Sequence, residues 1–254
     1  MKNIFVGGEL RSARQKKAQK LIKSPLLALV GVVIFFILLS VILANTIKHK
    51  GQFDSVALVE VDGGSGSAIH IGNNKLLTAA HVVYGMQNGD ACQVIFEDPN
   101  NTSGRKIHAL AQLSAMGNWN PLDTTCYTND FALLVVQTVD LSDLGVKVAP
   151  IGKSANIKVN DNINVVGYPN GVYMNTSGTL NNISGGILNN TAMVVVNAGA
   201  WPGNSGGGLF NSNGELIGIV TLTGNKMSNE TSGQTMAIKT DHIRSELLLK
   251  GHKI

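Results

Sequence analysis

The chain has 254 residues, of which 44% are hydrophobic and 14% are charged. This length suits one globular unit with an additional segment outside it, and it is too short for two large domains. Residues 1–50 hold nine of the 20 Lys and Arg residues and one of the 16 Asp and Glu residues, a charge of +8. The remaining residues carry 11 cations and 15 acids, a charge of −4, so they offer no basic stripe that would indicate a nucleic-acid partner.

The first 50 residues predict a membrane anchor. Residues 1–24 form a basic tail, and residues 25–45 form an apolar segment in which only Gly31 and Ser40 interrupt the first 20 positions. Twenty residues in a helix span about 30 Å, which is the thickness of the hydrocarbon core of a bilayer. We therefore expect residues 25–45 to cross the membrane once.

A cleavable signal peptide is the alternative interpretation of the same segment. The apolar run is longer than a usual signal sequence, and Ile42 before Ala44 breaks the small-x-small cleavage pattern. Seven cations precede the run and two follow it, so the positive-inside rule places residues 1–24 in the cytoplasm. Residues 51–254 are then expected to be extracytoplasmic, either periplasmic or extracellular.

The rest of the chain is predicted to consist of short strands separated by Gly, Asn and Pro turns, which is typical of an all-β barrel or sandwich. Six strands precede residue 145, six follow it, and residues 141–158 link the two groups. The predicted strands cover residues 55–61, 66–71, 75–79, 92–97, 106–113, 131–136, 162–167, 176–183, 192–197, 207–210, 215–221 and 234–238.

A helix is expected at the end of the chain. Asp241 is predicted to cap it, Ile243, Leu247 and Leu248 give it an apolar stripe, and Gly251 is placed to end it. The chain also lacks His-Glu-x-x-His and Cys-x-x-Cys patterns and a phosphate-binding loop. We therefore expect neither a metal nor a cofactor.

Three segments carry residues suited to nucleophilic catalysis. His81 follows the strand at 75–79, and Asp130 precedes the strand at 131–136. Ser205 lies between glycines, which permit backbone angles denied to other residues. A serine nucleophile needs a base and backbone N–H groups aimed at the developing oxyanion. Taken alone, the three features indicate only a core histidine, a turn aspartate and a glycine-rich turn. Together they have the chain order His, Asp, Ser, and this order distinguishes the unrelated hydrolase folds that use the same three catalytic groups.

The sequence around Ser205 also fits G-x-S-x-G, the nucleophile motif of α/β-hydrolases, which requires a helix directly after the serine. Here three glycines and a short apolar run follow it, so no helix is expected. Those enzymes have the order Ser, acid, His, which would leave only His242 and His252 as bases. The sequence therefore argues against this alternative.

Taken together, these motifs resemble the chymotrypsin-fold serine proteases, and within them the bacterial high-temperature-requirement (HtrA) type. The resemblance covers roughly residues 54–245, and the chain stops where the peptide-binding PDZ module of many relatives would begin. The motifs that carry it are TAAHVV at 78–83, DFALL at 130–134, PGNSGG at 202–207 and NGELIGI at 213–219, with weaker matches at 64–68 and 165–169.

The resemblance implies a fold of two six-stranded antiparallel β-barrels, at about 54–145 and 155–240, within a protease domain at 51–254. The apolar run adds one transmembrane helix before this domain. It implies that Ser205 attacks the peptide carbonyl, that His81 is the base and that Asp130 orients it. The backbone N–H groups of Gly203 and Ser205 would form the oxyanion hole. Polypeptides, including unfolded ones, are the expected substrates. Trimers occur in the family, but no residue here specifies an oligomeric state.

The resemblance also implies a substrate pocket with Gly199 at the position where trypsins carry an acid. Without an acid, Lys and Arg before the scissile bond are expected to be rejected, because a buried unpaired charge is costly. Glutamate-specific relatives place a His on the later strand, where this chain has Val and Thr. We therefore expect cleavage after small or medium apolar residues. The expected wall residues are Gly199, Ala200, Trp201, Ile219, Val220 and Thr221.

Two details bear on maturation. Asn204 stands where animal trypsins have the Asp that pairs with a new N-terminal amine, so activation by that kind of clipping is not expected. Cys92 and Cys126 are the only cysteines. In the resembled fold their segments converge, so they either form a disulfide, as an oxidising exterior would permit, or remain buried thiols.

A second functional hypothesis is a catalytically idle relative that binds peptides or a partner.

Overall fold

The computed structural model describes residues 30–38, 54–97, 106–123, 127–185, 190–223 and 234–254. The chain divides into two units, residues 1–50 and 51–254. In the first unit residues 30–38 form a helix whose large apolar side chains are 49% to 61% exposed. Among the described residues, no helix is both long enough and apolar enough to cross a bilayer. Most of the predicted span at 25–45 lies outside the described residues.

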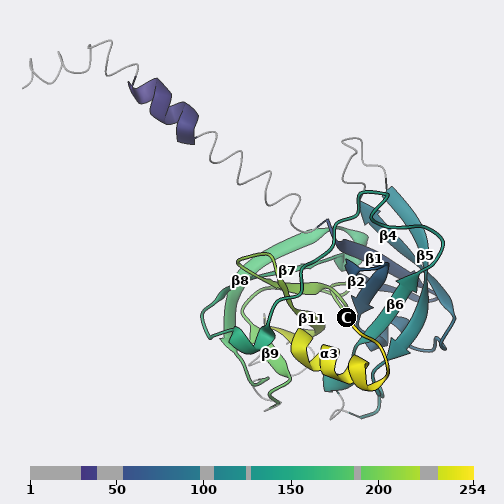
Figure 1. The fold of residues 1–254 in the computed structure, drawn as a ribbon. Helices are drawn as coiled ribbons and strands as arrows, with labels where there is room; N and C mark the ends of the chain where they lie inside the picture. Colours follow the sequence, from purple (N-terminus) through teal and green to yellow (C-terminus); the bar gives the residue numbers. More distant parts are fainter. Residues whose placement is uncertain (1–29, 39–53, 98–105, 124–126, 186–189, 224–233) are drawn as a thin grey trace, which may run out of the picture. The chain divides into compact units, whose positions relative to one another are not determined.

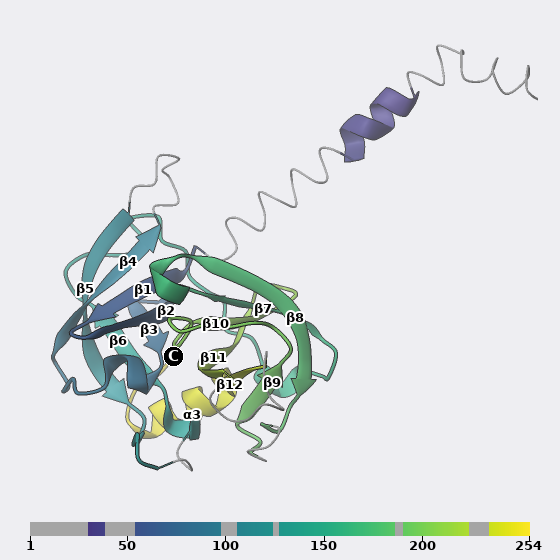
Figure 2. The same cartoon turned by 180° about the vertical axis from the view of Figure 1, so that it is seen from behind.

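The described part of the second unit contains two closed antiparallel barrels (Figures 1 and 2). Their strand orders are β1-β2-β3-β6-β5-β4 and β10-β11-β12-β9-β8-β7. The strands of the first barrel are β1 Val56–Val61, β2 Gly64–Gly72, β3 Lys75–Thr78, β4 Ala91–Glu97, β5 Lys106–Met116 and β6 Ala132–Val136. Those of the second are β7 Asn162–Gly167, β8 Met174–Asn182, β9 Met193–Val196, β10 Gly208–Asn211, β11 Leu216–Thr223 and β12 Thr235–Lys239.

Alternation along the strands divides the apolar side chains between the barrel cores and a layer shared by both barrels. In β1, Ala57 and Val59 pack inside the first barrel, whereas Val56 and Leu58 belong to a cluster that also includes residues of the second barrel. Successive side chains of a strand point to opposite faces, so a strand that is apolar at every position can serve both cores. This shared layer packs the two barrels against each other.

Helix α3, Thr240–Leu249, closes the chain against the second barrel. Ile243 and Leu247 are fully buried, but Leu248 is exposed, so the apolar stripe is narrower than expected. The prediction that Asp241 caps the helix is wrong, because Lys239 occupies the capping position and Asp241 lies in the first turn.

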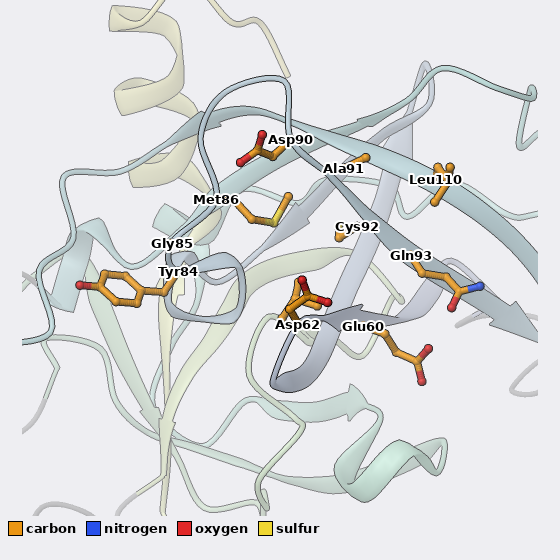
Figure 3. A pocket seen from close by; sticks show the side chains of 11 residues that line it. Glu60, Asp62, Tyr84, Gly85, Met86, Asp90, Ala91, Cys92, Gln93 and Leu110 are labelled. Atoms are coloured by element: carbon orange, nitrogen blue, oxygen red, sulfur yellow. The ribbon is translucent and has the colours of Figure 1, made fainter.

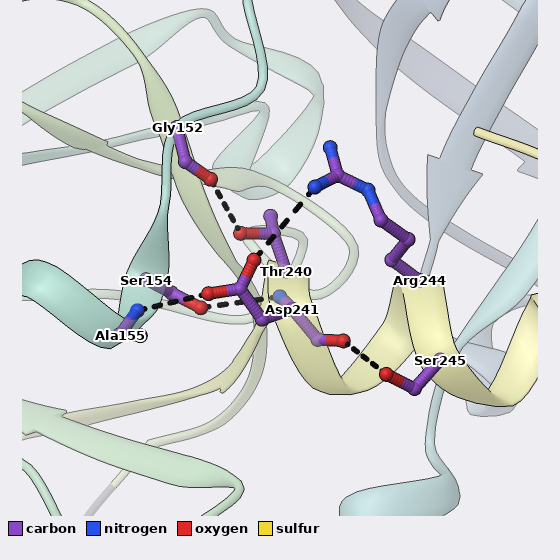
Figure 4. Close-up of polar contacts among 7 residues, drawn as sticks. All are labelled: Gly152, Ser154, Ala155, Thr240, Asp241, Arg244 and Ser245. Atoms are coloured by element: carbon purple, nitrogen blue, oxygen red, sulfur yellow. Dashed lines mark hydrogen bonds and ion pairs between the residues drawn. The ribbon is translucent and has the colours of Figure 1, made fainter.

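The Asp241 side chain instead ties the start of α3 to the segment that links the barrels (Figure 4). Its carboxylate accepts a 2.9 Å hydrogen bond from the Ala155 N–H, and its own N–H donates to Ser154 Oγ at 3.1 Å. Gly251 ends the helix as predicted, with a φ of 84°, a left-handed conformation that favours glycine.

Cys92 is a free thiol in the structure. It points into the core of the first barrel, where it is 4% exposed and its Sγ lies 3.6 Å from the Ala111 carbonyl oxygen. Burial raises the pKa of this thiol to about 11, because the thiolate would lose its hydration. Cys126 lies outside the described residues, so the choice between a Cys92–Cys126 disulfide and two buried thiols stays a prediction.

Candidate active site

His81 and Asp130 meet at the end of the first barrel. His81 lies in the short 3-10 helix Ala80–Val83 that follows β3, and Asp130 directly precedes Phe131 and β6. Because β3 and β6 pair side by side, the residues that flank their paired ends are brought together. Asp130 Oδ2 lies 2.7 Å from His81 Nδ1, and Asp130 Oδ1 accepts a 2.8 Å hydrogen bond from the His81 N–H.

The burial of the two side chains differs in the way that a base and its orienting acid require. The Asp130 side chain is 2% exposed, whereas the His81 side chain is 28% exposed. A buried carboxylate that holds both the backbone and the ring of one histidine fixes the orientation of that ring. The imidazole nitrogen Nε2 is thereby left for the solvent side.

Ser205 lies in the loop between β9 and β10, between two glycines in the left-handed region. Gly203 has a φ of 99° and Gly206 a φ of 80°, conformations that a side chain would strain. A Cβ on Gly206 would also collide with Ser67 O and Thr78 Oγ1 of the first barrel. The loop of the second barrel is therefore packed against the end of β3, which leads into His81.

Two N–H groups and the side-chain hydroxyl at Ser205 differ from the carbonyl groups around them, because they have no hydrogen-bond partner among the described residues. Within the residues that the structure describes, the N–H groups of Gly203 and Ser205 donate no hydrogen bond, which is what an oxyanion hole awaiting a substrate oxygen requires. In the same part of the chain, the Ser205 hydroxyl and His81 Nε2 also have no hydrogen-bond partner. Bonds between a nucleophile and its base are often loose in a free enzyme and tighten when substrate binds.

Among the residues expected to form the substrate pocket, Trp201 is exposed, whereas Ile219, Val220 and Thr221 are buried. Trp201 is 47% exposed, and its ring carbons lie within 2.9 to 3.5 Å of the point where a Cβ on Gly199 would stand. Ile219 belongs to the layer between the barrels and Val220 to the core of the second barrel, and both are buried. Thr221 is 3% exposed, with its hydroxyl unpartnered. The indole of Trp201 thus covers the glycine at the expected pocket base.

Two residues near the site were not among the candidate site residues of the sequence. The Trp119 ring centroid lies 5.9 Å from that of His81 and 5.3 Å from that of Tyr84, in a loop after β5 whose Gly, Asn and Pro residues indicate only a turn. Ser67 in β2 donates its N–H to Ser205 O at 2.8 Å. Both contacts depend on tertiary packing, which local sequence patterns do not report.

His70 illustrates the opposite outcome, a histidine that the fold buries. It is fully buried in β2, and its Nδ1 lies 2.9 Å from the Lys147 carbonyl oxygen. Burial lowers its pKa below the ordinary value of 6.5, because the charged ring would lose its hydration. Its position inside the protein excludes it as a base for an external substrate. Among the described residues, no group of three His, Cys, Asp or Glu side chains is placed to hold a metal ion.

A hollow of about 730 Å³ opens elsewhere on the first barrel (Figure 3). The carboxylates of Glu60, Asp62 and Asp90 line it together with Tyr84 and Met86. His81, Asp130 and Ser205 are not among its lining residues. The hollow is therefore separate from the group of residues predicted to catalyse a reaction.

Several solved protease structures share this fold. Rv3671c protease of M. tuberculosis, in an inactive form, is 18% identical, with a TM-score of 0.57 over 82% of this chain and 94% of that chain. The HtrA-type protease AlgW, solved with a tripeptide, is 24% identical with a TM-score of 0.55, and a serine endoprotease from Yersinia pestis is 24% identical with a TM-score of 0.57. This chain is covered to 81% in both alignments and spans 61% and 65% of those two longer chains.

Fold similarity at these identities does not assign the chain to a family, but a family model does. The model described as a trypsin-like peptidase domain matches residues 64–219, which is more than half of the chain. The match includes His81, Asp130 and Ser205, and the two barrels are those expected of a chymotrypsin fold. The chain therefore belongs to the trypsin-like peptidase family, whose members are serine hydrolases that act on peptide bonds.

Proposed function

We propose that this protein is a membrane-anchored serine endopeptidase that cuts extracytoplasmic proteins, with Ser205 as nucleophile, His81 as base and Asp130 as the residue that orients the base. The observation that carries the proposal is the pair of hydrogen bonds, 2.7 and 2.8 Å long, that joins His81 to the buried Asp130. It is supported by the glycine-flanked loop of Ser205, which packs against the strand that leads into His81.

The first step of the mechanism is proton transfer from Ser205 to His81. An ionised Asp130 accepts the proton of Nδ1, so His81 takes the tautomer in which Nε2 has a free lone pair. As the Ser205 oxygen attacks the peptide carbonyl, Nε2 removes its proton, and the buried carboxylate stabilises the resulting imidazolium. The imidazolium then protonates the leaving amine, which leaves an acyl group on Ser205 for water to hydrolyse.

The negative charge of the tetrahedral intermediate needs donors that point at it before the reaction begins. The unpartnered N–H groups of Gly203 and Ser205 are the donors that we assign to this role. Such preorganised donors stabilise the transition state more than the substrate, and removing one commonly costs about 100- to 1,000-fold in kcat.

The proposed specificity is for small or medium apolar residues before the cut. Neither residues 197–201 nor residues 219–223 contain an acid that would pair with Lys or Arg. The Trp201 ring lies against Gly199, so we assign an apolar surface to the base of the pocket. On the edge of β11 that faces β10, backbone pairing ends at Val220. The residues of β11 after Val220 can therefore pair with an extended substrate on that edge.

The first prediction is that a peptide library is cleaved mainly after Val, Ala or Leu. Cleavage after Lys, Arg or Glu is expected to be at least about 100-fold slower, because each would bury a charge without a partner. Mass spectrometry of the digested library measures the residue before each cut. Dominant cleavage after a charged residue would reject the pocket assignment and leave the catalytic assignment intact.

The membrane anchor is proposed on the sequence and on the exposed helix of the first unit. Residues 30–38 present large apolar side chains such as Phe35 and Phe36, each 61% exposed, and water is an unfavourable environment for a surface of this kind. A bilayer around residues 25–45 would cover these side chains.

The second prediction concerns topology. A protease added outside intact cells or spheroplasts is expected to degrade residues 51–254 and to spare a tag fused to the N-terminus. Immunoblotting of both ends measures this, with detergent-lysed cells as the control in which both ends are degraded. Recovery of residues 51–254 as a soluble, secreted fragment would instead show that the apolar segment is a cleaved signal peptide.

The second candidate function is a catalytically idle protein that binds peptides or a partner. The observation in its favour is the Ser205 hydroxyl, which lacks a hydrogen bond to His81 in the described residues. A fluorophosphonate probe distinguishes the two candidates, because it reacts rapidly only with a serine that is activated by a base. Labelling of the folded wild-type chain is expected, and absence of labelling with and without peptide substrate would favour the idle protein.

A further inference from the structure

We infer that Ser67 is a positioning residue that holds the oxyanion-hole loop of the second barrel in place from the first barrel, an inference that rests on the proposed function. Ser67 lies in β2 and is fully buried. Its polar groups all have partners. The N–H donates to Ser205 O at 2.8 Å, Oγ donates to Gly203 O at 2.7 Å and accepts from the Tyr168 N–H at 2.8 Å, and the carbonyl accepts from Thr78 Oγ1 at 2.7 Å.

The loop around the nucleophile is fixed by its carbonyl groups. Four consecutive carbonyls accept one hydrogen bond each, and Ser67 supplies two of the four donors. These bonds are Pro202 O with the Asn170 N–H at 3.1 Å, Gly203 O with Ser67 Oγ, Asn204 O with the Gly207 N–H at 2.8 Å, and Ser205 O with the Ser67 N–H. Ser67 Oγ is the only side-chain donor in this set.

The two oxyanion donors depend on the orientation of these peptides. In a trans peptide the C=O and N–H point in opposite directions, so the bonds to Pro202 O and Asn204 O also aim the Gly203 and Ser205 N–H groups. The peptide between Gly203 and Asn204 separates the two donors, and its carbonyl is the one that Ser67 Oγ holds. If that peptide rotates, the two N–H groups no longer converge on one oxygen.

The glycine at this point makes the external constraint necessary. Gly203 has a φ of 99°, and glycine has the widest choice of backbone angles, so the bonds to its peptide groups restrict its conformation. Within the loop, the N–H of the Gly203–Asn204 peptide donates to Trp201 O at 2.9 Å, and Ser67 Oγ holds the carbonyl of the same peptide from the first barrel. The hydroxyl also satisfies the N–H of Tyr168, which is 2% exposed. One buried side chain therefore links β2 to both loops of the second barrel that surround the oxyanion hole.

The test uses the full chain with Ser67→Ala, which removes the bond to Gly203 O and keeps the backbone bond to Ser205 O. We expect kcat on the best library peptide to fall by about 10- to 100-fold, because the Gly203 and Ser205 N–H groups no longer point at the same oxygen. KM is expected to stay within about threefold, because substrate binding does not use the oxyanion. The inhibition constant of a peptide boronate, whose adduct places a negative oxygen in the hole, is expected to rise in parallel with the loss of kcat.

A matched control separates this effect from loss of stability. Thr240 begins α3, away from the nucleophile loop, and its buried hydroxyl contacts the Gly152 carbonyl oxygen. Thr240→Val removes this hydroxyl. It is expected to lower Tm with kcat unchanged. Should Ser67→Ala not fold, Ser67→Cys keeps a weak donor at the same place and is expected to lower kcat at least about threefold with unchanged KM.

The outcomes separate this inference from the proposed function. A wild-type chain that reacts with fluorophosphonate, together with a Ser67→Ala or Ser67→Cys variant whose kcat and boronate affinity equal those of the wild type, would overturn the role of Ser67 alone. A rise in KM with unchanged kcat would also overturn it, because that pattern indicates a binding residue. A folded wild-type chain that neither cleaves peptides nor reacts with the probe would overturn both.

Discussion

Replacement of Ser205 by Ala is expected to abolish cleavage of an unfolded protein such as casein. The substitution removes the nucleophile while leaving the base, the orienting acid and the oxyanion donors in place. Loss of the nucleophile from a catalytic triad commonly lowers kcat by about a million-fold, which leaves no measurable turnover above background. The measurement is the release of peptides from casein by purified wild-type and variant chains at equal concentration.

The matched control is Ser212→Ala, an exposed serine in the turn between β10 and β11. It is expected to cleave casein at the wild-type rate. Tm is measured for all three chains, and the Ser205→Ala chain is expected to be as stable as the wild type because Ser205 is only partly buried and its hydroxyl has no partner among the described residues. Cleavage by a folded Ser205→Ala chain at more than about a thousandth of the wild-type rate would contradict the assignment of the nucleophile.

Replacement of Asp130 by Asn is the second substitution with a large expected effect. The asparagine keeps the shape of the carboxylate, but its amide group donates a hydrogen bond where Asp130 Oδ2 accepts one from His81 Nδ1. His81 is then held in the tautomer with its proton on Nε2, so it can no longer accept the proton of Ser205. A substitution of this kind lowers kcat by about 10,000-fold.

The control for this variant is Asp140→Asn, which changes an exposed aspartate whose carboxylate accepts from the Ser142 N–H in the turn after β6. Its kcat is expected to match that of the wild type. Steady-state kinetics on one apolar peptide compares the chains, and Tm establishes that each is folded. A kcat for Asp130→Asn within about tenfold of the wild type would show that Asp130 does not set the tautomer of His81.

Most strands were predictable because they are short, apolar and bounded by turn residues; β8, with the sequence MNTSGTLNN, is the polar exception. The twelve predicted strands correspond to β1 through β12, and the ends differ by three residues at most, as at Met116 in β5. For strands such as β3, β6 and β9, burial on both faces explains the agreement, since the apolar run gives a strong signal whichever core its residues face. The two-barrel arrangement came from resemblance, because strand patterns alone do not specify pairing.

The details that sequence could not supply are set by contacts between distant residues. Ser67 lies in a predicted strand, but its partner Gly203 is 136 residues away, so no local pattern reports the bond. Asp241 was expected to cap α3, but its carboxylate accepts from the Ala155 N–H and its own N–H donates to Ser154 Oγ, both in the linker. His81 and Asp130 were identifiable because their positions at strand ends coincide with a known order of catalytic residues.

The measurement that tests the central claim most directly is the position of a fluorophosphonate adduct on the folded wild-type chain. The labelled protein is digested, and tandem mass spectrometry identifies the modified residue. We expect a single phosphonylated residue, Ser205, and no adduct in the Asp130→Asn chain under the same exposure. An adduct on another serine, or none on a folded chain incubated with peptide substrate, would contradict the claim that Ser205 is a nucleophile activated by His81 and Asp130.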